Sequence, residues 1–147
     1  MAEKGGKMPE KILIVDDELD MLRLLEMIIK EKTTYETVGT NNPYEAIELA
    51  KQRKFDLVIT DLKMPGLDGI EVLEAIRRID ENIPIILITA YATLESAVEI
   101  MGKGGFDLIT KPFRKEQILF TIDKAIKWVR LQRENKILKE RLKNTEG

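Results

Sequence analysis

Three short apolar runs rich in β-branched residues constrain the fold more than any other feature of this chain. They occupy residues 12–15, 57–60 and 85–88. Apolar residues at consecutive positions predict strands that are buried on both faces, as in a parallel sheet covered by helices. Two weaker strands are predicted at 36–39 and 106–109. The chain is therefore expected to contain a five-stranded sheet.

Longer amphipathic stretches separate these runs and predict helices at 18–31, 43–53, 69–80 and 93–103. The apolar stripe expected on the first of them consists of Leu22, Leu25, Met27, Ile28 and Ile29. Strands that alternate with helices indicate an α/β fold, because right-handed crossovers place helices on both faces of a parallel sheet. We therefore predict a doubly wound sandwich.

Composition excludes several classes of function. The 147 residues suffice for one domain, and the net charge of −2 gives no electrostatic case for nucleic acid or an anionic membrane as a direct partner. The chain has no cysteine and no histidine, which rules out a Cys nucleophile, a His base and thiolate zinc sites. It contains neither a signal-peptide pattern nor an apolar stretch long enough for a membrane span, so a cytoplasmic domain is expected.

Polar residues stand where the predicted strands end. Asp16 and Asp17 follow the first strand, Asp61 follows the third, Thr89 the fourth and Lys111 the fifth. Each alone has an ordinary explanation, since an Asp after a strand often caps a helix and most lysines are solvated. In a doubly wound sheet, however, the carboxyl ends of the strands form the ligand-binding edge. We therefore expect these five side chains to converge.

The predicted cluster has a specific chemistry. Three carboxylates repel one another and require a cation, and oxygen ligands without His or Cys favour Mg²⁺. A carboxylate beside Mg²⁺ can act as a nucleophile towards phosphorus. Thr89 can donate a hydrogen bond to a phosphoryl oxygen, and Lys111 can pair with another. The set fits phosphoryl transfer onto Asp61.

These motifs resemble the receiver domain of two-component response regulators, a flavodoxin-like (βα)5 sandwich, over residues 11–125. The matching segments are Asp16-Asp17, Asp61, Met64-Pro65-Gly66-Leu67-Asp68-Gly69, Thr89-Ala90 and Lys111-Pro112-Phe113. The resemblance implies that Asp61 accepts a phosphoryl group from a histidine kinase. It also implies that Asp17, Asp61 and the backbone carbonyl of Lys63 bind Mg²⁺ directly, and that Asp16 binds it through a water molecule. Thr89 would move towards the phosphate and Lys111 would hold it.

One position departs from the family pattern. Receiver domains often carry Tyr or Phe three residues before the lysine, and this ring moves inward when the threonine moves. Leu108 occupies that position here, and the aromatic Phe106 lies two residues earlier. A leucine offers neither a ring nor a hydroxyl, so the usual aromatic switch is not expected. The resemblance also implies a cis peptide bond between Lys111 and Pro112.

The carboxyl-terminal segment predicts one long helix, because residues 115–146 contain neither Gly nor Pro. Ile118, Ile122, Ala125, Ile126 and Val129 are expected to pack on the domain. Beyond them a heptad places Trp128, Asn135 and Leu142 at a positions and Leu131 and Leu138 at d positions. Oppositely charged g and e residues, Glu134 with Lys139 and Arg141 with Glu146, favour a parallel dimer. A solvated terminal helix is the alternative.

Such an extension resembles the linker of NtrC-class transcription activators, which continue into an AAA+ ATPase and a DNA-binding domain. We therefore expect a flexible segment at 1–10, a receiver domain at 11–127, and a dimerising coiled-coil linker at 128–147 of a truncated regulator. One alternative is a single-domain regulator that docks on a target protein. Another is a haloacid-dehalogenase-type phosphatase, which Lys63 argues against because that class needs an Asp there. A non-enzymatic phosphoacceptor is expected.

Overall fold

The computed structural model describes residues 8–146, so most of the predicted amino-terminal segment at 1–10 lies outside the described residues. Five strands form one sheet in the order β2-β1-β3-β4-β5, and every neighbouring pair is parallel. They are β1 (Lys11–Val15), β2 (Glu36–Thr40), β3 (Leu57–Asp61), β4 (Ile85–Thr89) and β5 (Asp107–Thr110). The strand order reverses beside β1, which confirms the predicted doubly wound sandwich.

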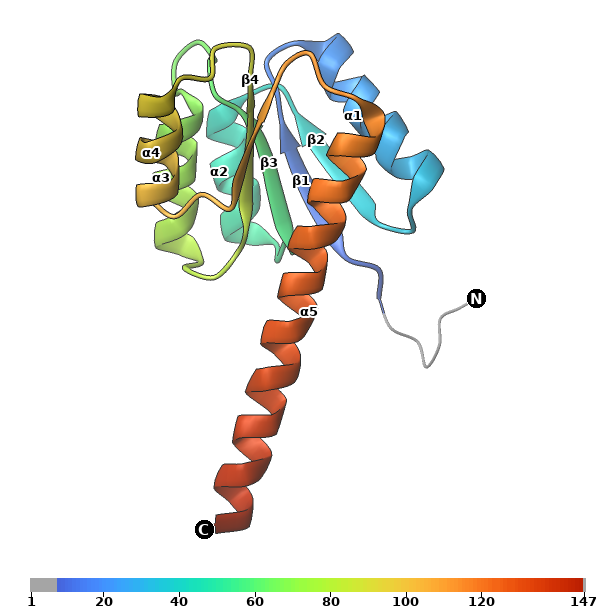
Figure 1. Ribbon diagram of the computed structural model, residues 1–147, viewed down its shortest axis with the longest axis vertical. Coiled ribbons are helices and arrows are strands. Elements are labelled where there is room, and N and C mark those ends of the chain that lie inside the picture. Colours follow the sequence, from blue (N-terminus) through green and yellow to red (C-terminus); the bar gives the residue numbers. More distant parts are fainter. Residues whose placement is uncertain (1–7, 147) are drawn as a thin grey trace.

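Helices cover both faces of the sheet (Figure 1). They are α1 (Leu19–Lys32), α2 (Pro43–Gln52), α3 (Gly69–Ile79), α4 (Leu94–Gly102) and α5 (Lys115–Glu146). Helices α1 and α5 pack on one face, and α2, α3 and α4 pack on the other. Successive residues of β1 alternate between these two layers, with Ile12 and Ile14 in one apolar cluster and Leu13 and Val15 in the other.

Local signals explain where three of the helices begin. Asn42 accepts hydrogen bonds from the first backbone N–H groups of α2, and Pro43 supplies a preset φ at the first helical position. Asp68 and Glu71 form a capping box at the start of α3. Thr93 and Ser96 form a second capping box at the start of α4. These caps set the positions of the loops that follow β3 and β4.

Three details differ from the sequence expectations. Met27 is 49% exposed, so the buried stripe of α1 consists only of Leu22, Leu25, Ile28 and Ile29. The prediction for Met27 was wrong because this side chain lies at the solvent-exposed margin of the apolar stripe. Asp61 and Thr89 are the last residues of β3 and β4 and do not follow these strands. Phe106 precedes β5, although its N–H still donates to the carbonyl of Ile85.

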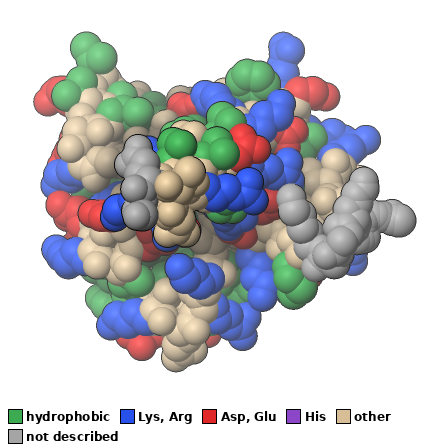
Figure 2. All heavy atoms as spheres, turned by 90° about the horizontal axis from the view of Figure 1, so that it is seen from below, with side chains coloured by type: hydrophobic (Ala, Val, Ile, Leu, Met, Phe, Trp, Pro, Cys, Tyr) green, Lys and Arg blue, Asp and Glu red, His purple; other side chains and the backbone are tan. Residues whose placement is uncertain are grey.

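Helix α5 has two parts with different surroundings. Its first half packs on the sheet through Ile118, Ile122, Ala125, Ile126 and Val129, all of which are buried. Its second half projects away from the domain (Figure 1), and every described side chain from Arg130 onward is exposed. Viewed from below, this end of the molecule mixes basic, acidic and hydrophobic side chains (Figure 2). No helix within residues 8–146 is long and apolar enough to cross a membrane.

Candidate functional site

Asp61 stands at the carboxyl end of the fully buried central strand β3, and only 7% of its surface is exposed. Its Oδ1 accepts a hydrogen bond of 2.9 Å from the backbone N–H of Leu62. That N–H also donates to the carbonyl of Ile88 on β4, at 3.0 Å. The carboxylate is therefore held at the sheet edge by the same amide that joins β3 to β4.

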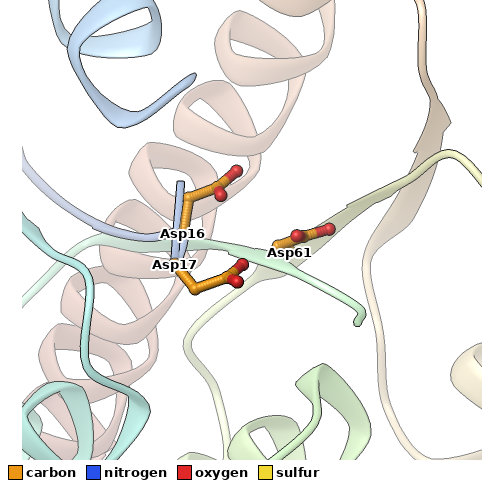
Figure 3. Close-up of side chains that lie close together, drawn as sticks. All are labelled: Asp16, Asp17 and Asp61. Carbon is orange, nitrogen blue, oxygen red and sulfur yellow. The ribbon is translucent and has the colours of Figure 1, made fainter. Parts of the chain in front are cut away.

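Asp16 and Asp17 lie beside Asp61 because β1 and β3 are neighbours in the sheet. Carboxylate oxygens of the three residues lie within 4.8 Å of one another. Figure 3 shows that Asp16 and Asp17 extend towards Asp61 from the segment after β1. Asp16 is 1% exposed, and its Oδ1 accepts a hydrogen bond of 2.9 Å from the N–H of Glu18. The predicted acidic cluster is therefore present.

Crowding of buried negative charge changes the acidity of two of these groups. The pKa of Asp61 is raised to about 6, mainly by burial and then by the neighbouring Asp16 carboxylate, while the Lys111 ammonium opposes both. Burial also raises the pKa of Asp16, against the hydrogen bond from Glu18 and the charge of Lys111. Because burial disfavours the ionised form of both carboxyl groups, a cation bound among these oxygens would stabilise that form.

Lys111 brings one positive charge to the cluster from the end of β5. Its Nζ lies 3.6 Å from Asp16 Oδ2 and 3.6 Å from Asp61 Oδ1. The peptide bond between Lys111 and Pro112 is cis, as the family resemblance implied. The ammonium thus faces the carboxylate that would receive a phosphoryl group.

Thr89 ends β4 in the interior of the protein and is 0% exposed. Its Oγ1 accepts a hydrogen bond of 3.0 Å from the N–H of Tyr91, which leaves its hydroxyl proton available for donation. Its carbonyl accepts the backbone N–H of Lys111, at 2.8 Å. Thr89 and Lys111 are therefore joined through the backbone at the same sheet edge as Asp61.

The loop between β3 and α3 returns close to Asp61. Gly66 has a φ of +89°, which side chains of L-residues disfavour. A Cβ on Gly69 would lie 2.4 Å from the Asp61 carbonyl oxygen and 2.8 Å from the Leu62 Cα. Glycine is required there because the start of α3 touches the end of β3. The side chain of Lys63 in this loop is exposed, and the role of its carbonyl in metal binding stays a prediction.

Leu108 and Phe106 pack on opposite faces of the sheet. Leu108 belongs to the apolar layer formed with α2, α3 and α4. Phe106 packs into the α1 and α5 layer, with its ring centroid 6.2 Å from that of Trp128. Phe106, the aromatic residue two positions before Leu108, therefore contacts α5, in the layer opposite the one that contains α4.

One contact of the site was not predicted. The Glu18 carboxylate lies 3.7 Å from Lys111 Nζ, although its side chain is 67% exposed. The sequence places an acid directly after Asp17, which could have signalled a fourth carboxylate. Whether it reaches Lys111 depends on the direction of the lysine side chain, which no motif specifies.

Comparison with known proteins gives a consistent picture. The profile of the response regulator receiver domain matches residues 12–123. Sporulation initiation phosphotransferase F of Bacillus subtilis (strain 168) is 38% identical over 119 residues, which cover 81% of this chain and 95% of that protein. Regulatory protein AtoC of Escherichia coli (strain K12) is 35% identical over 132 residues, or 90% of this chain and 28% of AtoC.

Solved structures agree. The crystal structure of NtrX from Brucella abortus in complex with ADP has a TM-score of 0.81 at 29% identity, covering 89% of this chain and 30% of NtrX. The chain thus spans 28% of AtoC and 30% of NtrX. Both the sequence and the structure matches therefore lie in one part of these longer regulators.

Proposed function

We propose, from the premise that this chain belongs to the response regulator receiver domain family of two-component systems, that Asp61 accepts a phosphoryl group from a histidine kinase. The observation that carries the proposal is the convergence of three carboxylates, one hydroxyl and one ammonium at the carboxyl edge of the sheet. We place this exchange in the cytoplasm, where receivers of this family meet their kinases.

The chemistry of the donor set fits a hard divalent cation. Three carboxylates approach one another within 4.8 Å, and burial followed by the Asp16 charge raises the pKa of Asp61, so a cation would stabilise its ionised form. We propose that Asp17, Asp61 and the Lys63 carbonyl hold Mg²⁺ and that Asp16 acts through a water molecule. When bound, Mg²⁺ would offset negative charge on the phosphoryl oxygens and on Asp61.

Residues of the chain supply the remaining steps. An Asp61 oxygen attacks phosphorus, the phosphorus–nitrogen bond of the donor phosphohistidine breaks, and the imidazole leaves with the bonding electron pair. The product is an acyl phosphate on Asp61. Lys111, now 3.6 Å from Asp61 Oδ1, pairs with a phosphoryl oxygen, and the Thr89 hydroxyl donates to another.

Acetyl phosphate with Mg²⁺ tests this proposal, with phosphorylation followed by phosphate-affinity electrophoresis. Asp61→Asn is expected to abolish the shifted band. Asp80→Asn is the matched control. Asp80 follows the last residue of α3 at the opposite edge of the sheet, and the amide oxygen of the new side chain can still accept the hydrogen bond from the Asn82 N–H. Phosphorylation of Asp61→Asn at the wild-type rate would remove Asp61 from this role.

We also propose that the chain is a regulatory phosphoacceptor and not a phosphatase. Haloacid-dehalogenase-type enzymes need an acid two residues after their nucleophile, and Lys63 stands there with its side chain exposed. Turnover of a phosphomonoester by the purified chain would contradict the assignment.

Helix α5 supports a dimeric arrangement, with 128–147 as the linker beyond a receiver at 11–127. The side chains at the d positions, Leu131 and Leu138, are 57% and 49% exposed, and Leu142 at the following a position is 63% exposed. Val129, two residues before Leu131, faces the receiver, and residues two apart on a helix point to different sides. A second α5 can therefore pack along the leucines without detaching either helix from its receiver.

The output that we propose is transcription activation through an AAA+ ATPase and a DNA-binding domain in the full-length protein. AtoC and NtrX, which this chain matches over about a quarter to a third of their length, support this proposal through their place in the NtrC class. Phosphorylation would shift the population between two arrangements of the paired linkers.

A further inference from the structure

Glu18 occupies the N-cap position of α1 but makes no capping hydrogen bond with its side chain. Ser, Thr, Asp and Asn are the residues that cap helices well, and the longer Glu side chain is poorly suited to that task. Its carboxylate lies instead 3.7 Å from the Nζ of Lys111. The residue therefore faces the phosphoacceptor site and not the end of its own helix.

Lys111 is shared among three carboxylates at nearly equal distances. Its Nζ lies 3.6 Å from Asp16, 3.7 Å from Glu18 and 3.6 Å from Asp61. Each distance is longer than a charge-assisted hydrogen bond, so no single partner captures the ammonium. Removal of one of these charges would leave Lys111 freer to pair with an incoming phosphoryl group.

Exposure distinguishes Glu18 from the other two acids. Asp16 and Asp61 have side chains that are only 2% and 8% exposed, whereas that of Glu18 is 67% exposed. Its carboxylate therefore stands at the solvent side of the cluster, where a donor must approach. Phosphodonors are anions, so a negative charge at this entrance opposes their approach.

We propose that Glu18 is a positioning residue that slows phosphorylation of Asp61 by small anionic donors, because it shares Lys111 and places a negative charge at the entrance of the site. The inference rests on the proposed function of Asp61. It adds a rate-setting group outside the five residues that the family motifs identify.

The test compares wild type with Glu18→Gln, using acetyl phosphate and Mg²⁺ at low ionic strength. Phosphorylation of the variant is expected to be roughly three- to ten-fold faster, since charges several ångströms apart at a protein surface interact through a high effective dielectric. The gain should shrink at high salt, which screens exposed charges. It should also be smaller with phosphoramidate, which carries one negative charge less than acetyl phosphate at neutral pH.

Three control variants separate the charge effect from other causes. Glu18→Asp keeps the negative charge at the entrance, but its shorter side chain can cap α1 and lies farther from Lys111, so its rate is expected to fall between those of the wild type and Glu18→Gln. Glu31→Gln removes the same charge from an exposed position near the other end of α1 and should leave the rate unchanged. Asp61→Asn should not react, and its phosphorylation would overturn the proposed function and not this inference.

A structural role of Glu18 gives a different result. Loss of its favourable interaction with the positive end of α1 would lower stability in Glu18→Gln, but would not make the rate depend on salt or on donor charge. Equal rates for wild type and Glu18→Gln at low salt would overturn the inference. So would a gain that is the same at high salt and with both donors.

Discussion

Single residues of the site hold negative charge where water has little access. Asp16 and Asp61 are almost completely buried, and within residues 8–146 only Lys111 lies within ion-pair distance of both. Burial is the main reason why the pKa values of both carboxyl groups are raised. Such a site is less stable without a cation and gains stability from whatever neutralises it.

The pKa of Asp61 predicts a pH-dependent gain of stability in Asp61→Asn when metal is chelated. Because the folded-state pKa of about 6 lies above the ordinary 3.8, the Asp61 contribution to stability is fully present below pH 3.8 and is lost as the pH rises through 6. At pH 8 the uncharged amide should therefore raise the free energy of unfolding, by up to about 3 kcal/mol.

Urea unfolding in EDTA at pH 8 and pH 4.5 measures this difference. The gain should be much smaller at pH 4.5, where most of the wild-type carboxyl is already protonated in the folded protein. Destabilisation of Asp61→Asn at pH 8, or an equal gain at both pH values, would contradict the electrostatic account.

Close backbone contact at Gly69 predicts a loss of stability in Gly69→Ala. The added methyl would lie 2.4 Å from the Asp61 carbonyl oxygen, so α3 must shift, at about 1 to 3 kcal/mol. Gly102→Ala is the control, because a Cβ there meets nothing within 4 Å and Ala favours a helix. Equal unfolding midpoints for the two variants would show that α3 is not held against β3.

Among the elements, α5 links the site-bearing domain to the projecting segment. Two ion pairs fasten the point where it leaves the receiver. Arg130 binds Glu10 through two hydrogen bonds of 2.8 and 3.0 Å, and Arg133 pairs with Asp56. The Arg130 hydrogen bond is the main reason why the pKa of Glu10 is lowered. These contacts lie on the side of α5 that faces the domain, so they leave the leucines free for a partner helix.

The heptad predicts different effects for two neighbouring aliphatic residues of α5. Leu138 at a d position is 49% exposed, and Ile137, which is at neither an a nor a d position, is 50% exposed. The two side chains therefore have the same exposure in the single chain. In a parallel dimer only Leu138 is buried. Leu138→Ala should weaken dimerisation roughly tenfold or more, since truncating a buried Leu costs a few kcal/mol.

Sedimentation equilibrium measures the dimer dissociation constants of the wild type and of both variants. Ile137→Ala is expected to associate like the wild type. Equal weakening by both substitutions would place the interface on another face of the helix, and a wild-type monomer at all concentrations would remove the linker dimer.

In the whole molecule, the layers of helices and strands could be predicted from the sequence, because short local patterns of residues determine each strand and helix. β-branched runs determine the strands, and the parallel topology then brings Asp16, Asp61 and Lys111 to one edge. Contacts that depend on how elements dock were not predictable. Glu10 and Arg130 are 120 residues apart in the sequence and meet only because α5 packs on the sheet near the start of β1. Phe106 is a second example. It precedes β5 and packs against Trp128, and these two facts determine on which face of the sheet its ring lies.

Borohydride trapping identifies the side chain that carries the phosphoryl group. Reduction of an aspartyl phosphate converts the acid to homoserine, which tandem mass spectrometry can locate after incubation with acetyl phosphate and Mg²⁺. Homoserine is expected at position 61 and at no other acidic position. Homoserine at Asp16, Asp17 or Glu18 in place of Asp61 would contradict it, as would complete absence of trapped product under conditions in which the chain is folded.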